Sequence, residues 1–69
     1  MTFGDLLTRS RGDRGQQEIA DKLGVSQPTI SSWEAESSYP RKSRLRRIAA
    51  VYGVEYARLV DAWIRSGSC

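Results

Sequence analysis

The sequence predicts an all-α fold, a compact bundle of about five short helices. Apolar residues recur three and four positions apart in five successive segments, which is the period of one helix face. Glycine, proline and serine residues separate these segments, and no segment shows the strict alternation typical of a strand. With 69 residues the chain has room for one domain. We therefore expect a single domain over residues 1–66, followed by a flexible tail at residues 67–69.

The first two helices are expected in the N-terminal third of the chain. The first begins after Thr2, a good N-cap residue, and ends near Arg11, where residues 12–15 predict a turn. The second begins near Gln16 and ends at Gly24, because glycine readily adopts the left-handed conformation common after a helix. Their predicted core residues are Phe3, Leu6, Leu7, Ile19, Ala20 and Leu23.

The third helix is expected from about Gln27 to Glu36. Pro28 fits its first turn, where the missing N–H costs nothing. Ile30 and Trp33 lie three positions apart and face inward. The opposite side carries short polar side chains, whereas a helix that only faces solvent usually carries long charged ones. This contrast marks the outer side of the helix as a candidate binding surface.

Two further helices complete the expected bundle. The fourth runs from about Arg41 to Tyr52 and ends at Gly53, and the fifth runs from about Glu55 to Arg65. Their predicted inward residues are Leu45, Ile48, Ala49, Tyr52, Tyr56, Leu59 and Val60.

The composition excludes several classes of site. Cys69 is the single cysteine and the chain has no histidine, so no internal disulfide, metal site, or serine–histidine or cysteine–histidine catalytic pair is predicted. We expect a protein that is not an enzyme and that needs no cofactor. No apolar run approaches the roughly 20 residues needed to cross a bilayer, and no signal peptide is visible. A cytoplasmic location is therefore expected.

Charge is distributed unevenly along the chain. The net charge is +3, and five of the seven residues from 41 to 47 are basic. One interpretation is a solvated helix face. However, cations in the first turn of a helix oppose the helix dipole, and a phosphate bound there would offset that cost. The basic run therefore favours a nucleic-acid partner.

The stretch QQEIADKLGVSQPTISSWE, residues 16–34, carries the most specific pattern in the chain. It predicts two short helices joined by a turn at residues 24–26, where a glycine permits a sharp change of direction. Ala20 is small where the two helices cross, and Ile30 and Trp33 hold the second helix against the first. This spacing is typical of a helix-turn-helix, whose second helix enters the major groove of DNA.

This run closely resembles the lambda-repressor-like family of bacterial and phage transcription regulators, also described as the Cro/repressor-type or XRE family. The resemblance extends more loosely through LRRIAA at residues 45–50 and YGV at residues 52–54. It implies a five-helix bundle that binds double-stranded DNA, usually as a dimer on a two-fold symmetric operator.

The resemblance also implies roles for individual residues. Gln16 would bond a backbone phosphate and steady Gln27, whose amide can pair with N6 and N7 of adenine. Pro28 and Ser32 match family positions that face bases, although the third helix offers no arginine or lysine for reading guanine. The candidates for contacts with the DNA backbone are Thr29, Ser31, Ser38, Arg41, Lys42 and Arg44. Family members often pair the glutamate that ends this helix, here Glu34, with an arginine of the first helix, and the sequence leaves Arg9 and Arg11 as alternatives.

Two apolar residues near the end of the fifth helix are candidates for a dimer interface. Trp63 and Ile64 exceed what a small core needs, and a symmetric dimer is the simplest way to cover them. The alternative is that they fold back over Phe3 and Leu6. We expect a homodimer, either one that is stable in solution or one that forms fully only on DNA.

The expected function is that of a small Cro-type repressor. No effector domain is visible after the binding unit, so repression would follow from occupying an operator and blocking polymerase. The alternatives are a protein-interaction module of the antitoxin or adaptor type and a restriction-modification controller, because fold alone does not determine function.

Overall fold

The computed structural model describes residues 2–66, so the tail predicted at residues 67–69 lies outside the described part. Within residues 2–66 the chain forms five helices and no strand, which confirms the predicted all-α class. The helices are α1 (Phe3–Arg11), α2 (Gln16–Leu23), α3 (Gln27–Glu34), α4 (Lys42–Tyr52) and α5 (Tyr56–Arg65).

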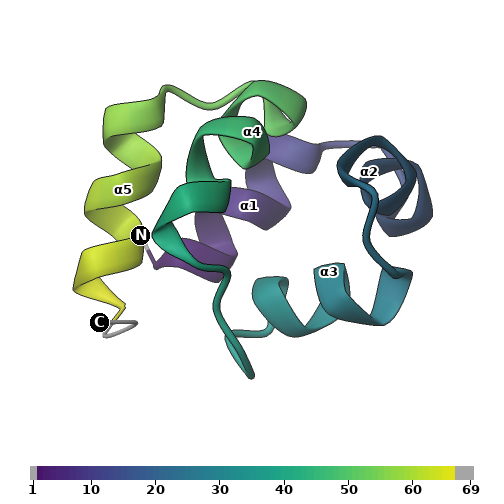
Figure 1. The fold of residues 1–69 in the computed structure, drawn as a ribbon, viewed down its shortest axis with the longest axis horizontal. Coiled ribbons are helices and arrows are strands. Elements are labelled where there is room, and N and C mark those ends of the chain that lie inside the picture. The colour runs from purple at the N-terminus through teal and green to yellow at the C-terminus, as the bar shows by residue number, and fades with distance from the viewer. Residues whose placement is uncertain (1, 67–69) are drawn as a thin grey trace.

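Three of the helices, α3, α4 and α5, pack against α1 (Figure 1). Helix α2 packs against both α3 and α4. Helix α5 lies along the opposite end of the molecule from α2, and α3 forms the lower edge in this view. The bundle measures 26 × 22 × 21 Å. This arrangement leaves α3 at the periphery, held on its inner side only.

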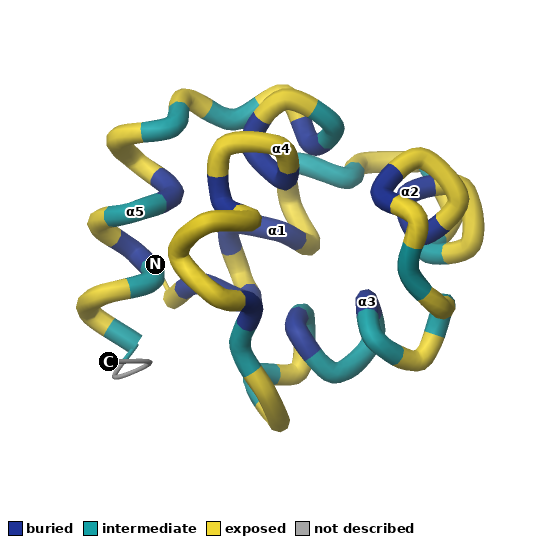
Figure 2. Tube along the Cα trace, in the orientation of Figure 1, coloured by how far each residue is buried: buried dark blue, intermediate teal, exposed yellow. Residues whose placement is uncertain are grey.

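One apolar core contains residues from all five helices (Figure 2). Every core residue predicted for the first four helices is buried. The fifth helix differs, because Ala62 is buried beside Leu59 whereas Tyr56 and Val60 are only half-buried. The buried side chains are Phe3, Leu6, Leu7, Ile19, Ala20, Leu23, Ile30, Trp33, Leu45, Ile48, Ala49, Tyr52, Leu59 and Ala62.

The third helix ends at Glu34, two residues earlier than predicted from the sequence. Glu36 adopts a left-handed conformation with φ of 60°, which helical geometry does not allow. Its N–H donates to the carbonyl of Trp33 at 3.2 Å, and the N–H of Ser37 donates to that of Ser32 at 2.9 Å. These two bonds close the helix in a Schellman motif, normally built on glycine, and turn the chain away from α3.

The side chain of Glu36 supports this unusual backbone. Its carboxylate accepts the N–H of Gly4 at 3.2 Å and the hydroxyl of Tyr39 at 3.0 Å, so it reaches the N-terminus of α1. Tyr39 also donates to the carbonyl of Ser66 at 3.1 Å. Hydrogen bonding by Thr2, followed by the bonds from Tyr39 and Gly4, lowers the pKa of Glu36. The end of α3 is thereby joined to the start of α1 and the end of α5.

Gly4 lies where α1 crosses the end of α3. A Cβ atom at this position would lie 2.2 Å from the carbonyl oxygen of Glu34 and 3.0 Å from its carbonyl carbon. Both are backbone atoms, so the two helices would have to separate. We expect Gly4→Ala to lower the free energy of unfolding by about 1–3 kcal/mol, measured by urea denaturation with tryptophan fluorescence.

Gly15→Ala is the matched control. Gly15, the N-cap of α2, has an ordinary φ of −77° and no neighbouring atom within 4 Å of the added Cβ. Alanine is a poorer N-cap than glycine but restricts the unfolded chain, so we expect the two effects to offset each other to within about 0.5 kcal/mol. Equal urea midpoints of unfolding for both variants would show that the close approach of α1 and α3 does not contribute to stability.

Candidate nucleic-acid interface

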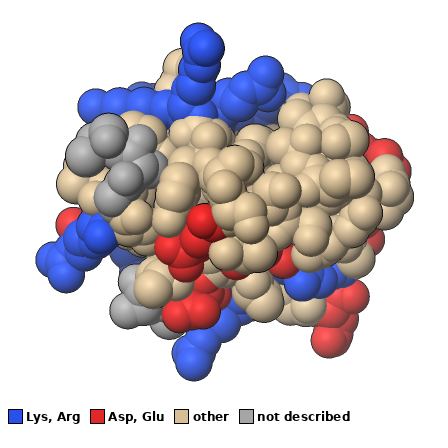
Figure 3. Space-filling view, turned by 90° about the horizontal axis from the view of Figure 1, so that it is seen from below, with Lys and Arg blue, Asp and Glu red and all other residues tan. Residues whose placement is uncertain are grey.

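The outer side of α3 is the candidate interface. Ile30 and Trp33 are 0% and 6% exposed and attach the inner side of the helix to the core. On the outer side Pro28 is exposed, and Ser31 and Ser32 are half-exposed. No other helix in residues 2–66 covers this side (Figure 1). Seen from below, a broad part of the face is uncharged and lysine and arginine side chains line its upper edge, while acidic side chains lie near the middle and at the lower right (Figure 3).

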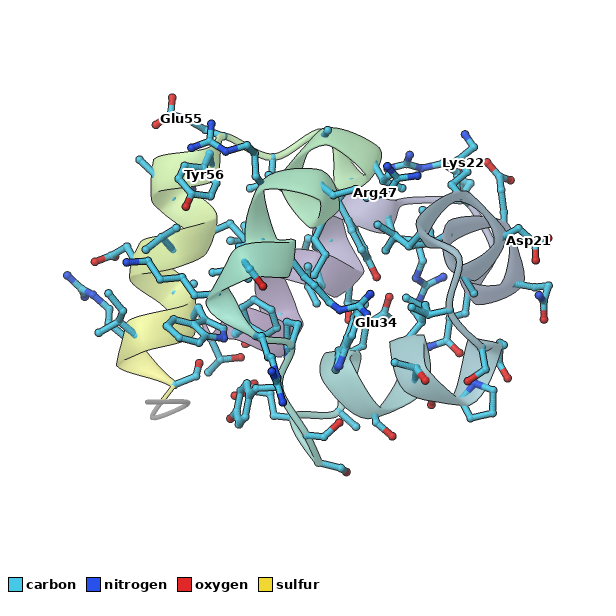
Figure 4. The ribbon with its side chains drawn as sticks, viewed as in Figure 1. Asp21, Lys22, Glu34, Arg47, Glu55 and Tyr56 are labelled. Atoms are coloured by element: carbon cyan, nitrogen blue, oxygen red, sulfur yellow. The ribbon has the colours of Figure 1, made fainter. Side chains whose placement is uncertain are left out.

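Glu34, the last residue of α3, is the centre of a polar network (Figure 4). Its side chain is 6% exposed. Arg11 donates to both carboxylate oxygens, from Nε at 2.9 Å and from Nη2 at 3.0 Å. The hydroxyl of Tyr52 donates at 2.9 Å, and the Nε2 group of Gln16 donates at 3.0 Å. Of the two arginines left open by the sequence, the structure therefore pairs Arg11 with Glu34.

The network extends to the first residue of α3. The Oε1 atom of Gln16 accepts a hydrogen bond from the Nε2 group of Gln27. Both glutamines begin their helices and both are half-buried. The structure thus brings together the two glutamines that the sequence singled out, and it connects them to Glu34.

The network changes the protonation of its members. Burial alone would raise the pKa of Glu34, but the hydrogen bonds from Arg11, Gln16 and Tyr52 outweigh it and the pKa is lowered. Burial and the nearby carboxylate raise the pKa of Tyr52, and the bond to Glu34 raises that of Arg11. Because the pKa of Glu34 is depressed in the folded state, its stabilising effect is present at neutral pH and is lost as the pH falls through that lowered value.

Basic side chains lie beside α3 at the start of α4. Arg41, Lys42 and Arg44 are all exposed, and Arg41 is the N-cap of α4. A groove of about 640 Å³ separates this helix start from α3. Thr29 lines the groove, and its hydroxyl bonds that of Ser26 at 2.8 Å. The lining residues are Val25, Thr29, Trp33, Tyr39, Pro40, Arg41, Ser43 and Arg44.

Other residues of the basic run serve the fold itself. The guanidinium of Arg46 lies 4.6 Å from the ring centre of Tyr56. Arg47 donates to the carbonyl of Lys22 at 3.2 Å and so caps the end of α2 (Figure 4). Ser38 is exposed in the loop after α3. The basic residues that remain candidates for contacts with phosphate are therefore those at the start of α4, Arg41, Lys42 and Arg44.

The sequence interpretation missed two structural contributors. Tyr52 was expected only as a core residue. The helical spacing that predicts its burial gives no indication of where its hydroxyl group binds. Arg14, in the turn before α2, donates to the carbonyls of Ser10, Val51 and Tyr52 at 2.7–3.0 Å. A lone arginine in a glycine-containing turn is a weak signal, since such residues are usually solvated.

The two dimer candidates differ in their surroundings. Trp63 is half-buried against the core, and its indole N–H donates to the carbonyl of Pro40 at 2.9 Å. Ile64 is 52% exposed. Trp63 thus contributes to the packing within one chain, while Ile64 offers apolar surface to solvent.

Across residues 2–66, no group of three or more acidic, cysteine or histidine side chains is arranged to hold a metal ion. None of the helices described is both long and apolar enough to cross a membrane.

Comparisons with known proteins match this architecture. The sequence profile of the Helix-turn-helix family matches residues 15–59. The chain is 44% identical over 60 residues to Antitoxin HigA1 from two strains of Mycobacterium tuberculosis, covering 87% of this chain and 35% of that protein. It is 34% identical over 67 residues to the "Putative HTH-type transcriptional regulatory protein" of Methanosarcina acetivorans, covering 94% of this chain and 20% of that protein. The chain thus spans about a third or less of the length of these relatives, and no solved structure matches it significantly.

Removal of Arg11 tests the energetic weight of the network. Arg11→Ala leaves the Glu34 carboxylate, 6% exposed, without its cation. We expect the free energy of unfolding to fall by about 2–4 kcal/mol in urea denaturation. The control is Arg65→Ala, because the pair of Arg65 with Asp61 has side chains 76% and 62% exposed and we expect a loss below about 1 kcal/mol. Similar losses for the two variants would contradict a structural role for the Arg11–Glu34 pair.

Proposed function

The chain belongs to the helix-turn-helix family, and from this premise we propose that it binds specific sites on double-stranded DNA through α3 and represses transcription by occupying them. The observation that carries the proposal is the Gln16–Gln27 pair at the first, uncovered turn of α3. The basic start of α4 lies across the groove from the middle of the same helix.

The outer side of α3 supplies the proposed base contacts. Gln27 reads a base edge, because its amide offers a donor and an acceptor at fixed spacing. Pro28 offers apolar contact to a thymine methyl group, and Ser32 offers a short hydrogen bond. These side chains are small, so the helix can enter deep into the major groove. With no arginine or lysine on α3, the shape of the DNA contributes to the choice of site.

The proposed phosphate contacts surround this helix. Gln16 retains one N–H beyond its bond to Glu34, and that group faces the DNA backbone. Thr29 and Ser31 on α3, and Ser38 in the loop after it, offer hydroxyl groups. Arg41, Lys42 and Arg44 add positive charge at the start of α4, where the helix dipole also favours an anion. The two glutamines thus determine the register of α3 on the DNA. The basic residues at the start of α4 supply most of the electrostatic attraction.

We include a homodimer in this proposal. Ile64 lies with Ala57 and Val60 along a shallow surface of α5 that a second copy would cover. Trp63 stiffens the same part of α5 through its bond to Pro40. The longest dimension of one bundle is 26 Å, so two copies side by side can place their α3 helices about 34 Å apart, one turn of B-DNA. This geometry requires a two-fold symmetric operator.

The similarity to Antitoxin HigA1 favours a second candidate, the DNA-binding part of an antitoxin. The two candidates share the α3 interface and differ in whether a toxin is the partner. The genomic neighbour of this chain distinguishes them. Growth arrest by the neighbouring gene product, relieved by coexpression of this chain, would support the antitoxin, and the absence of any such effect would support the repressor.

The phosphate contacts predict a steep dependence on salt. Each phosphate neutralised should contribute about 0.9 to the slope of log affinity against log salt concentration. Arg41→Ala and Arg44→Ala should each reduce the slope by about that amount and weaken specific and unrelated duplexes alike, as measured by fluorescence anisotropy. Arg58→Ala, on α5, is the control and should leave the slope unchanged. A slope near zero for the wild-type chain would contradict the proposed function.

The base contact of Gln27 predicts a loss of specificity. Sites selected from random duplexes supply the preferred sequence, which should be two-fold symmetric. On that duplex Gln27→Ala should cost about 1–3 kcal/mol of binding free energy, with little change on an unrelated duplex. Thr8→Ala, on the exposed side of α1, is a control that should affect neither duplex. Equal losses on both duplexes would remove Gln27 as a base reader.

A further inference from the structure

Glu34 determines the orientation of the amide groups in the network, that is, which end of each amide donates a hydrogen bond and which end accepts one. An ionised carboxylate can only accept hydrogen bonds, and every partner of this one donates. Its donors are the guanidinium of Arg11, the hydroxyl of Tyr52 and the amide of Gln16. With the carboxylate 6% exposed, water has little room to replace any of them.

This restriction passes to Gln16 and then to Gln27. Because Gln16 must present its NH₂ group to Glu34, its carbonyl oxygen is the end that faces Gln27. An acceptor at that point requires Gln27 to donate one of its two N–H groups. Gln27 is then left with one N–H and its carbonyl oxygen for a ligand.

The remaining groups of Gln27 match one purine and not the other. Adenine presents an acceptor at N7 and a donor at N6 in the major groove, whereas guanine presents two acceptors at N7 and O6. One donor and one acceptor on Gln27 fit adenine. If the relay ran in the opposite direction, Gln27 would accept from Gln16 and present two donors, which fit guanine.

We propose that Glu34 is a positioning residue for specificity, which orients the Gln27 amide through Gln16 so that Gln27 selects adenine over guanine. The inference rests on the proposed function, since it assumes that Gln27 meets a base. Glu34 itself lies beneath the interface and touches no DNA. Its contribution is to exclude the reversed orientation of two amides.

Glu34→Gln tests the proposal, because an amide at position 34 can either donate to Gln16 or accept from it. We expect the preference for adenine over guanine at the base opposite Gln27 to fall from about tenfold or more to about twofold or less. Affinity for an unrelated duplex should change much less than the base preference, since the phosphate contacts of Arg41, Lys42 and Arg44 are unchanged. Circular dichroism checks that the variant is folded.

Tyr52→Phe is the matched control. It removes one donor from the same carboxylate and lowers stability, but position 34 remains an acceptor only. The adenine preference should therefore be retained. Gln16→Met is a second test that spares Arg11, Glu34 and Tyr52, and it should abolish the preference by cutting the relay. A folded Glu34→Gln or Gln16→Met variant with the full adenine preference would overturn the proposal.

A measurement without DNA separates this proposal from the proposed function. In the NMR spectrum of the free protein, one side-chain NH₂ proton each of Gln16 and Gln27 should be protected from exchange with solvent. The protection should persist in Tyr52→Phe and disappear from Gln27 in Gln16→Met. Unprotected Gln27 protons in the wild-type chain would refute the relay. A protected relay in a chain that binds no duplex would instead refute the DNA-binding function.

Discussion

The buried carboxylate of Glu34 constrains the rest of the structure. A charge removed from water is costly unless hydrogen bonds replace its hydration. Here the replacements come from three other helices, through Arg11 of α1, Gln16 of α2 and Tyr52 of α4. Loss of any one of the three leaves the charge less well compensated and lowers stability. A single group therefore relates the positions of four helices and determines how α3 is presented.

Much of the fold and part of the candidate site could be predicted from sequence, because the signals are local. Gly24 and Gly53 end their helices with φ of 72° and 76°, as expected for glycine at that position. Ile30 and Trp33 are three positions apart and so share the inner side of α3. This spacing identified the outer side of the helix without any knowledge of tertiary contacts. Gln16 and Gln27 are eleven residues apart, but the fixed geometry of a helix-turn-helix brings the starts of its two helices together.

The remaining features depend on how helices cross, which a local pattern does not encode. Arg9 and Arg11 both lie in the last turn of α1, and only the packing of α1 against α3 selects Arg11 for Glu34. Ala62 is buried because a small side chain suits the contact between α1 and α5, and this rotation of α5 leaves Ile64 exposed. Glu36 takes a left-handed conformation that sequence rules reserve for glycine, since its carboxylate finds partners on α1 and in the following loop.

The short outer side chains of α3 have an evolutionary consequence. Pro28, Ser31 and Ser32 take no part in the apolar core, so each can be replaced singly while the scaffold persists. Under the proposed function, the preferred DNA site would change gradually as these three positions change. Gln27 is different, because its orientation depends on Gln16 and Glu34. Under the proposed function, a different base preference at Gln27 would require several compatible replacements. Divergence from this sequence should be gradual along most of the helix and abrupt at its first residue.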